Sequence, residues 1–170
     1  AAVAGPPTGK SGSTVLIAQS RLTVVQVLPA LEMGGVERGT LEVARRLVQE
    51  GHRSIVISAG GRLVAQLQAE GSEHLAWDVG AKRLATLRWI PKVRRLLRER
   101  RPDVLHLRSR LPAWIAYRAW KGLPSVERPA LVTTVHGFYT PGWYSSVMMR
   151  GERIIAISEA VRSHVLRHYP

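Results

Sequence analysis

The sequence predicts an α/β fold in which about six parallel strands form one sheet with helices on both of its faces. Short runs of aliphatic and β-branched residues recur along the chain, which is typical of strands buried inside a parallel sheet. Between these runs lie amphipathic stretches, several of which end at a glycine, as helices often do. This alternation indicates a Rossmann-like, doubly wound sheet with right-handed crossovers.

The expected elements follow one another at regular intervals. The first strand is expected at residues 23–28, and the helical spacing of Val36, Thr40 and Val43 predicts a helix over residues 36–49. The later strands are expected at residues 53–58, 73–79, 103–107, 130–135 and 153–157. The later helices are expected at residues 62–69, 86–100, 111–121 and 158–168, with a short helix or turn at 145–149. Ser158 is expected to cap the last helix.

Residues 1–20 differ in composition from the rest of the chain and are interpreted as a flexible leader before a domain over residues 21–170. Residues 4–11 match the loose pattern A-x-x-x-x-G-K-S of a phosphate-binding P-loop. A P-loop follows a strand, and the three residues before this pattern are too few to form one. The proline and glycine content of the segment favours a leader instead.

Composition narrows the class of protein. The 170 residues are 45% hydrophobic and 22% charged, which is ordinary for one globular domain. The chain contains no cysteine, which excludes disulfides and thiolate metal sites. No apolar run approaches the roughly 18 residues of a membrane-spanning helix, so no membrane span is expected. We expect a cytoplasmic protein that can lie peripherally on the inner face of the cytoplasmic membrane.

The net charge of +13 predicts an anionic partner, which could be phosphate, nucleic acid or acidic lipid. Residues 82–101 hold nine of the 25 Lys and Arg residues against one acid. Two interpretations stay open: a crossover helix with solvated arginines, or a helix whose basic face, with Lys92, Arg95 and Arg98, contacts an anionic membrane surface. Nucleic acid is not expected as a partner, because the aromatic residues lie mostly outside this basic segment.

The same segment carries an apolar stripe at helical spacing, formed by Leu84, Leu87, Ile90, Val93, Leu96 and Leu97. In either interpretation we expect this stripe to pack on the sheet, which leaves the basic face in contact with solvent or lipid.

A glycine pair, Gly34 and Gly35, joins the first strand to the first helix. Glycine allows a sharp turn and a close approach of the backbone to a ligand, and the free N–H groups of a helix start attract anions. The pair therefore indicates a phosphate site. A tight turn without a ligand explains the same two residues equally well.

Ligands of doubly wound sheets bind at the carboxyl ends of the strands. That edge is expected to carry Gly34, Gly35, Arg108, Ser109, Arg110, His136, Gly137, Phe138, Tyr139 and Ser158. Each of these residue types also has a purely structural interpretation: a histidine can bond within a turn, arginines can be solvated, and aromatic side chains can be half-buried packing.

Four motifs in this order resemble the amino-terminal half of a group 1 (family 4) glycosyltransferase, a class of bacterial enzymes that assemble lipopolysaccharide and other surface polysaccharides. The motifs are GGVER at residues 34–38, PDVLHLRSRLPAW at 102–114, TTVHGFY at 133–139 and IIAISE at 154–159. The resemblance implies a GT-B fold, in which two Rossmann-like domains face a cleft and this half mainly holds the acceptor.

The resemblance also implies that a carboxy-terminal domain binds most of the nucleotide-sugar donor, and this donor-binding domain is absent from the 170 residues. We therefore expect the chain to be inactive alone. The resemblance implies retention of the anomeric configuration, and we expect no metal or other cofactor. The implied partners are a nucleotide-sugar donor and a glycan or lipid-linked acceptor.

Carried over to this sequence, the resemblance implies that Gly34 and Gly35 bind the donor diphosphate and that His136 is catalytic, near the transferred sugar. It places the acceptor against Arg108, Arg110, Gly137, Tyr139 and Ser158. The alternative from another class is a non-catalytic, basic Rossmann-like module that binds anionic lipid or phosphate ligands.

Overall fold

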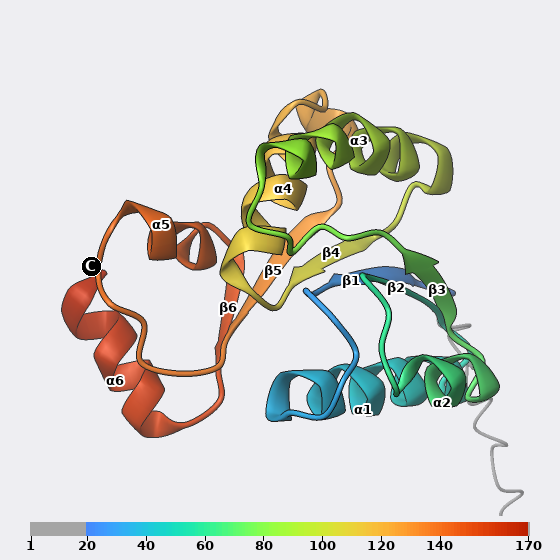
Figure 1. The fold of residues 1–170 in the computed structure, drawn as a ribbon, viewed down its shortest axis with the longest axis horizontal. Coiled ribbons are helices and arrows are strands. Elements are labelled where there is room, and N and C mark those ends of the chain that lie inside the picture. Colours follow the sequence, from blue (N-terminus) through green and yellow to red (C-terminus); the bar gives the residue numbers. More distant parts are fainter. Residues whose placement is uncertain (1–19, 170) are drawn as a thin grey trace, which may run out of the picture.

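The six expected strands are present in the computed structural model, which describes residues 20–169. They form one parallel sheet in the order β3-β2-β1-β4-β5-β6 (Figure 1). The strands are β1 (Thr23–Val27), β2 (Arg53–Ser58), β3 (Glu73–Ala76), β4 (Val104–Leu107), β5 (Ala130–Val135) and β6 (Arg153–Ala156). The expected α/β, Rossmann-like fold is confirmed. The Walker-like pattern at residues 4–11 and all but the last residue of the expected leader lie outside the described residues.

Helices connect the strands. The described helices are α1 (Gly35–Gln49), α2 (Val64–Ala69), α3 (Trp89–Arg100), α4 (Arg110–Lys121), α5 (Trp143–Ser146) and α6 (Glu159–His168). Short 3-10 helices lie within the connections: η1 (Leu84–Arg88), η2 (Ser125–Glu127) and η3 (Val147–Met149). The expected cap of the last helix is confirmed, because the Ser158 hydroxyl accepts a hydrogen bond of 3.2 Å from the N–H of Val161.

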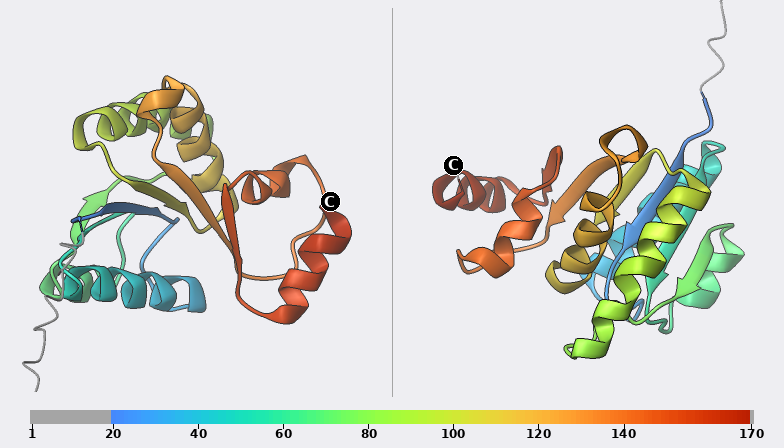
Figure 2. Two further views of the ribbon diagram at one scale, coloured as in Figure 1. Left: turned by 180° about the vertical axis from the view of Figure 1, so that it is seen from behind. Right: turned by 90° about the horizontal axis from the view of Figure 1, so that it is seen from above.

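Helices cover both faces of the sheet (Figure 2). Helices α1 and α2 lie on one face, along β1, β2 and β3, and α3 and α4 lie on the opposite face. The larger hydrophobic core joins the sheet to α3 and α4 and includes Val25, Leu105, Val93 and Ile115. A smaller core joins the sheet to α1 and α2 and includes Leu41 and Val56.

Strand β3 is shorter than expected and ends at Ala76 instead of residue 79. The N–H of Trp77 still donates to the carbonyl of Ser58, at 2.8 Å, but the carbonyl of Trp77 turns back and accepts from the N–H of Val79. This tight turn ends the ladder. The Trp77 ring then stacks on Trp89, with 5.5 Å between ring centroids, and so anchors the segment that leads to α3.

The segment before α3 differs from the expected continuous helix. Residues 84–88 form the 3-10 helix η1, and α3 begins at Trp89. A 3-10 helix has three residues per turn, so its side chains leave the stripe that a spacing of 3.6 predicts. Leu84 and Leu87 are 86% and 55% exposed, whereas Thr86 and Trp89 are buried. The expected packing of Leu84 and Leu87 on the sheet is therefore wrong.

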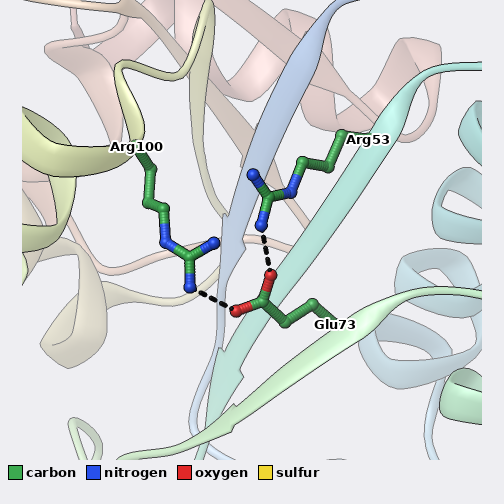
Figure 3. Close-up of polar contacts among 3 residues, drawn as sticks. All are labelled: Arg53, Glu73 and Arg100. Carbon is green, nitrogen blue, oxygen red and sulfur yellow. Dashed lines mark hydrogen bonds and ion pairs between the residues drawn. The ribbon is translucent and has the colours of Figure 1, made fainter.

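An ion-pair cluster closes the amino edge of the sheet, opposite the edge where ligands are expected. Glu73, the first residue of β3, accepts from Arg53 of β2 at 2.7 Å and from Arg100 at the end of α3 at 2.9 Å (Figure 3). Each carboxylate oxygen thus has its own guanidinium partner, and the cluster links two strands to a helix.

Candidate functional site

A cavity of about 570 Å³ opens at the carboxyl ends of β4, β5 and β6, beside the start of α1. The cavity is lined by Gly35, Val36, Gly39, Glu42, Val43, His106, Arg108, Thr134, His136, Ile155 and Ile157. Three predicted site residues, Gly35, Arg108 and His136, therefore face one space. A larger hollow of about 720 Å³ lies at the opposite edge, around the Arg98–Glu127 ion pair, and none of the predicted catalytic, donor or acceptor residues lines it.

The two glycines at the start of α1 differ in their surroundings. Gly34 is the N-cap residue in an extended conformation, with φ −157°, and a side chain there would collide with the carboxylate of Glu37. Nothing lies within 4 Å of a Cβ added to Gly35, and neither glycine has a positive φ. The turn therefore does not require glycine at position 35. The open space in front of Gly35 leaves the helix start accessible to an anion.

Arg108 is almost fully buried, at 4% exposure, and its charge lies at the cavity wall. Its Nε donates a hydrogen bond of 2.8 Å to Oε1 of Gln26. Burial lowers the pKa of Arg108 to about 10, so the guanidinium is charged at neutral pH. The ion pairs found within residues 20–169 do not include Arg108. The cavity thus holds a fixed positive charge.

Two histidines share this cavity. His106 is 6% exposed, and its Nε2 lies 2.7 Å from Oγ1 of Thr134. Burial, followed by the charges of Arg108 and His136, lowers the pKa of His106 to about 3. Burial and then Arg108 also lower the pKa of His136. Both rings are therefore neutral at pH 7. In the described part of the chain, Nε2 of His136 is buried without a hydrogen-bond partner, so the protein leaves its hydrogen-bonding capacity unused.

Arg110 lies in a different place from Arg108. It is the first residue of α4, and its guanidinium carbon lies 4.9 and 5.1 Å from the ring centroids of Tyr139 and Tyr144. Its Nη1 donates to the hydroxyl of Ser145 at 3.3 Å. Arg110 lines a second cavity, of about 680 Å³, between η1 and the start of α4. The sequence predicts that Arg108 and Arg110 lie together at the end of one strand. In the structure Arg110 is already part of α4, and its side chain lines the second cavity instead of the first.

Two further acceptor candidates lie outside the first cavity. Ser158 is exposed, and its hydroxyl is engaged in capping α6. Gly137 is half-buried in the loop after β5, with nothing within 4 Å of an added Cβ. Their role toward an acceptor stays a prediction.

The basic face of α3 carries partners of its own. Arg95 lies 3.6 Å from a carboxylate oxygen of Glu99, and Arg98 lies 3.5 Å from one of Glu127. Lys92 is exposed, and its Nζ lies 4.6 Å from the ring centroid of the Trp89 side chain. The two carboxylates reduce the net charge that this face offers to a membrane.

Sequence reasoning missed three polar residues at or beside the cavity: Gln26, His106 and Thr134. Gln26 of β1 lies directly beside His106 of β4, and the His106 ring reaches Thr134 on β5. Strands buried in a parallel sheet are expected to be apolar throughout. The sequence therefore does contain a signal for these residues, because each of them interrupts an apolar run that forms a strand. The sheet then brings the three strands together.

Within residues 20–169, no group of three or more His, Asp or Glu side chains is placed to hold a metal ion. The helices described in that range are too short or too polar to cross a bilayer. The expectation that no metal or other cofactor is needed stays a prediction.

The parallel sheet, with a ligand-sized cavity at its carboxyl edge, defines a Rossmann-like domain of the kind that forms one half of a GT-B fold. The model of the family described as Glycosyltransferase Family 4 matches residues 33–170. The chain belongs to this family. A comparison with curated protein sequences finds no match.

Solved structures agree with this assignment. A glycosyltransferase from Rickettsia africae is 36% identical, with a TM-score of 0.75, over 88% of this chain and 40% of its own. HepE from Anabaena, solved in complex with UDP and glucose, is 15% identical, with a TM-score of 0.65, over 88% of this chain and 42% of its own. At this identity the similarity shows the fold alone. The chain thus spans about two-fifths of the length of these structures.

Proposed function

We propose that this domain is the acceptor-side half of a retaining glycosyltransferase, which moves a sugar from a nucleotide-sugar to a glycan or lipid-linked acceptor. Membership of family 4 supports the class of reaction. The resemblance of the sequence motifs supports a role in the assembly of lipopolysaccharide or another surface polysaccharide. A second domain would complete the donor site, as in the GT-B arrangement.

One observation carries the proposal. Gly35, Arg108 and His136 come from α1 and from the ends of β4 and β5, and they line one cavity at the edge where ligands of this fold bind. A helix start and a fixed positive charge suit a diphosphate, and a neutral histidine can hydrogen-bond a sugar hydroxyl.

The chemistry assigns a role to each group. When the bond between the sugar and the diphosphate breaks, negative charge grows on the leaving diphosphate, and backbone N–H groups at Gly34 and Gly35 would stabilise it. His136 would hydrogen-bond the transferred sugar or the attacking acceptor hydroxyl. Arg108 would hold the part of the acceptor that enters this cavity, and Arg110 with Tyr139, outside it, would hold a more distant part, together with Gly137 and Ser158.

Calorimetry with UDP-glucose and GDP-mannose tests the proposal; UDP-glucose is chosen because the HepE structure contains UDP and glucose. We expect weak binding and no sugar transfer by the 170-residue chain, because the donor diphosphate would meet little more than the glycine pair. Micromolar binding and transfer are expected once a donor-binding domain is joined to it. Transfer by the chain alone, or none by the joined protein, would contradict the proposal.

A second candidate function, binding to an anionic membrane surface, rests on a different observation. The exposed Leu84 and Leu87 lie in η1, which also contains the exposed Arg88 and is preceded by the exposed Lys82 and Arg83. Exposed apolar side chains within a basic rim are typical of a surface that inserts shallowly into anionic lipid. With η1 inserted, Lys92, Arg95 and Arg98 on the following helix would contribute long-range attraction.

Vesicle sedimentation at two salt concentrations tests the membrane proposal. We expect binding to vesicles with anionic lipid, weaker binding at high salt, and loss of binding in the double variant Leu84→Ser, Leu87→Ser. Val126→Ser is the matched control, since Val126 is 93% exposed in η2 at the opposite edge of the sheet. Equal binding by the double variant and the control would contradict the proposal.

A further inference from the structure

Arg108 presents an unusual combination of burial and lack of a counter-charge. Its residue exposure is 4%, yet the one hydrogen bond of its side chain found within residues 20–169 uses Nε, not the terminal nitrogens. The terminal nitrogens are not among the side-chain atoms that are both buried and without a hydrogen-bond partner. Nη1 lies 3.6 Å from the position that a Cβ would take at Gly39. The end of the guanidinium thus opens onto the cavity, beside the first turns of α1.

Gln26 fixes the guanidinium in this position. The Gln26 side chain is fully buried; its Oε1 accepts from Arg108 Nε at 2.8 Å, and its Nε2 donates to the carbonyl of Thr40 in α1 at 3.2 Å. Both ends of the amide are therefore used, so its orientation is determined. Because an amide is neutral, it holds the guanidinium in place without cancelling its charge.

The other groups at the cavity leave this charge unopposed. His106 and His136 are neutral at pH 7, and Val36, Ile155 and Ile157 add apolar surface. Glu42 is the carboxylate among the lining residues, but it is exposed on α1, and no ion pair joins it to Arg108 in the described part of the chain. In such surroundings a charge-assisted hydrogen bond from a guanidinium is stronger than in open solvent.

We propose that Arg108, positioned by Gln26, forms a subsite for an anionic group, so that the ligand of this cavity carries a phosphate or a carboxylate. The place of this subsite in a reaction rests on the proposed glycosyl transfer, but anion binding itself does not. The anion has two possible sources: the diphosphate of the donor, or a charged group on the acceptor sugar.

The test is an NMR titration of the 170-residue chain, with pyrophosphate and UDP as donor-type anions, glucuronic acid and glucose 6-phosphate as acceptor-type anions, and glucose as the neutral probe. We expect anions to shift the signals of residues around Arg108 and glucose to leave them unchanged. Stronger binding of UDP and pyrophosphate assigns the anion to the donor, and stronger binding of the sugar acids assigns it to the acceptor.

Two variants test the positioning role. Gln26→Glu keeps the shape of the side chain but supplies an internal carboxylate, and Arg108→Gln removes the charge. Each should weaken anion binding by about tenfold to a hundredfold, the usual cost of one charged hydrogen bond. Arg118→Gln, at an exposed position on α4, removes the same charge elsewhere and should change the affinity little. A spectrum with the dispersion of the unmodified chain confirms the fold of each variant.

Unchanged affinity in folded Gln26→Glu or Arg108→Gln, or equal loss in Arg118→Gln, would overturn the proposal. So would anion-dependent shifts confined to residues far from the cavity. The proposed glycosyltransferase function would survive that result if nucleotide-sugar transfer by the two-domain protein persisted. Conversely, anion binding at Arg108 without any transfer by that protein would support the subsite and contradict the proposed function.

Discussion

The arginines at the two edges of the sheet differ in their burial and in the groups that hold them. At the amino edge, Arg53 and Arg100 both pair with the carboxylate of Glu73, and all three side chains are about a third exposed. At the carboxyl edge, Arg108 is almost fully buried and is held by a neutral amide. Charges paired at a surface cost little to keep, whereas a buried charge without a counter-charge costs stability. The amino edge is therefore built to join elements, and the carboxyl edge keeps a charge for a ligand.

The largest expected effect is on turnover, which should depend on a residue at the carboxyl edge and not on one at the amino edge. In the two-domain protein, His136→Ala should lower turnover by about 10² to 10³, the usual loss for one positioned hydrogen-bond donor at a reacting centre. Its melting temperature should barely change, because Nε2 of His136 has no hydrogen-bond partner among the described residues. His52→Ala, at the amino edge, is the matched control and should leave turnover unchanged. A His136→Ala protein that unfolds easily but keeps full activity in its folded fraction would assign this residue a structural role.

A smaller effect concerns stability and pH, again at the carboxyl edge. The pKa of His106 is about 3 in the folded chain and about 6.5 when unfolded, so the unfolded state binds more protons between these values. The contribution of neutral His106 to the free energy of unfolding is fully present above about pH 6.5. It should fall by about 1.4 kcal/mol for each pH unit below that value. The depressed pKa of His136 acts in the same direction.

Urea denaturation at pH 7.5, 6.5 and 5.5 measures this slope. His106→Gln keeps a polar group near Thr134 but removes the titration, so its stability should depend less on pH than that of the unmodified chain. His52→Gln is the control at the amino edge. An unchanged slope in His106→Gln would show that other groups cause the loss of stability in acid.

The smallest effect compares the two kinds of arginine site directly. Glu73→Gln should cost about 1 kcal/mol or less, because its two ion pairs are partly exposed and screened by solvent. Arg108→Met should change stability little, because removing a buried charge is offset by leaving the buried Oε1 of Gln26 without its hydrogen bond. Thermal unfolding at pH 7.5 measures both. A loss larger for Arg108→Met than for Glu73→Gln would show that Arg108 mainly supports the fold.

The strand pattern was predictable from sequence because aliphatic and β-branched runs identify buried parallel strands without reference to their neighbours. The segment at Leu84 and Leu87 was not predictable, because two apolar residues three positions apart fit one turn of either a 3-10 helix or an α-helix. The site was predicted in part. His136 and Gly35 follow recognisable strand ends and were found, whereas Gln26 and His106 lie inside strands and become significant once the sheet sets them side by side.

The polar residues inside β1 and β4 also have a consequence for how the chain folds. Strand β4 is four residues long, and successive side chains of a strand point to opposite faces. A misfolded pairing shifted by one residue would turn Leu105 and Leu107 toward the cavity and force His106 and the charge of Arg108 into the core beneath α3 and α4. Burying that charge among apolar side chains is far more costly than exposing two leucines. The residues proposed to recognise a ligand therefore also select the correct alignment of a very short central strand.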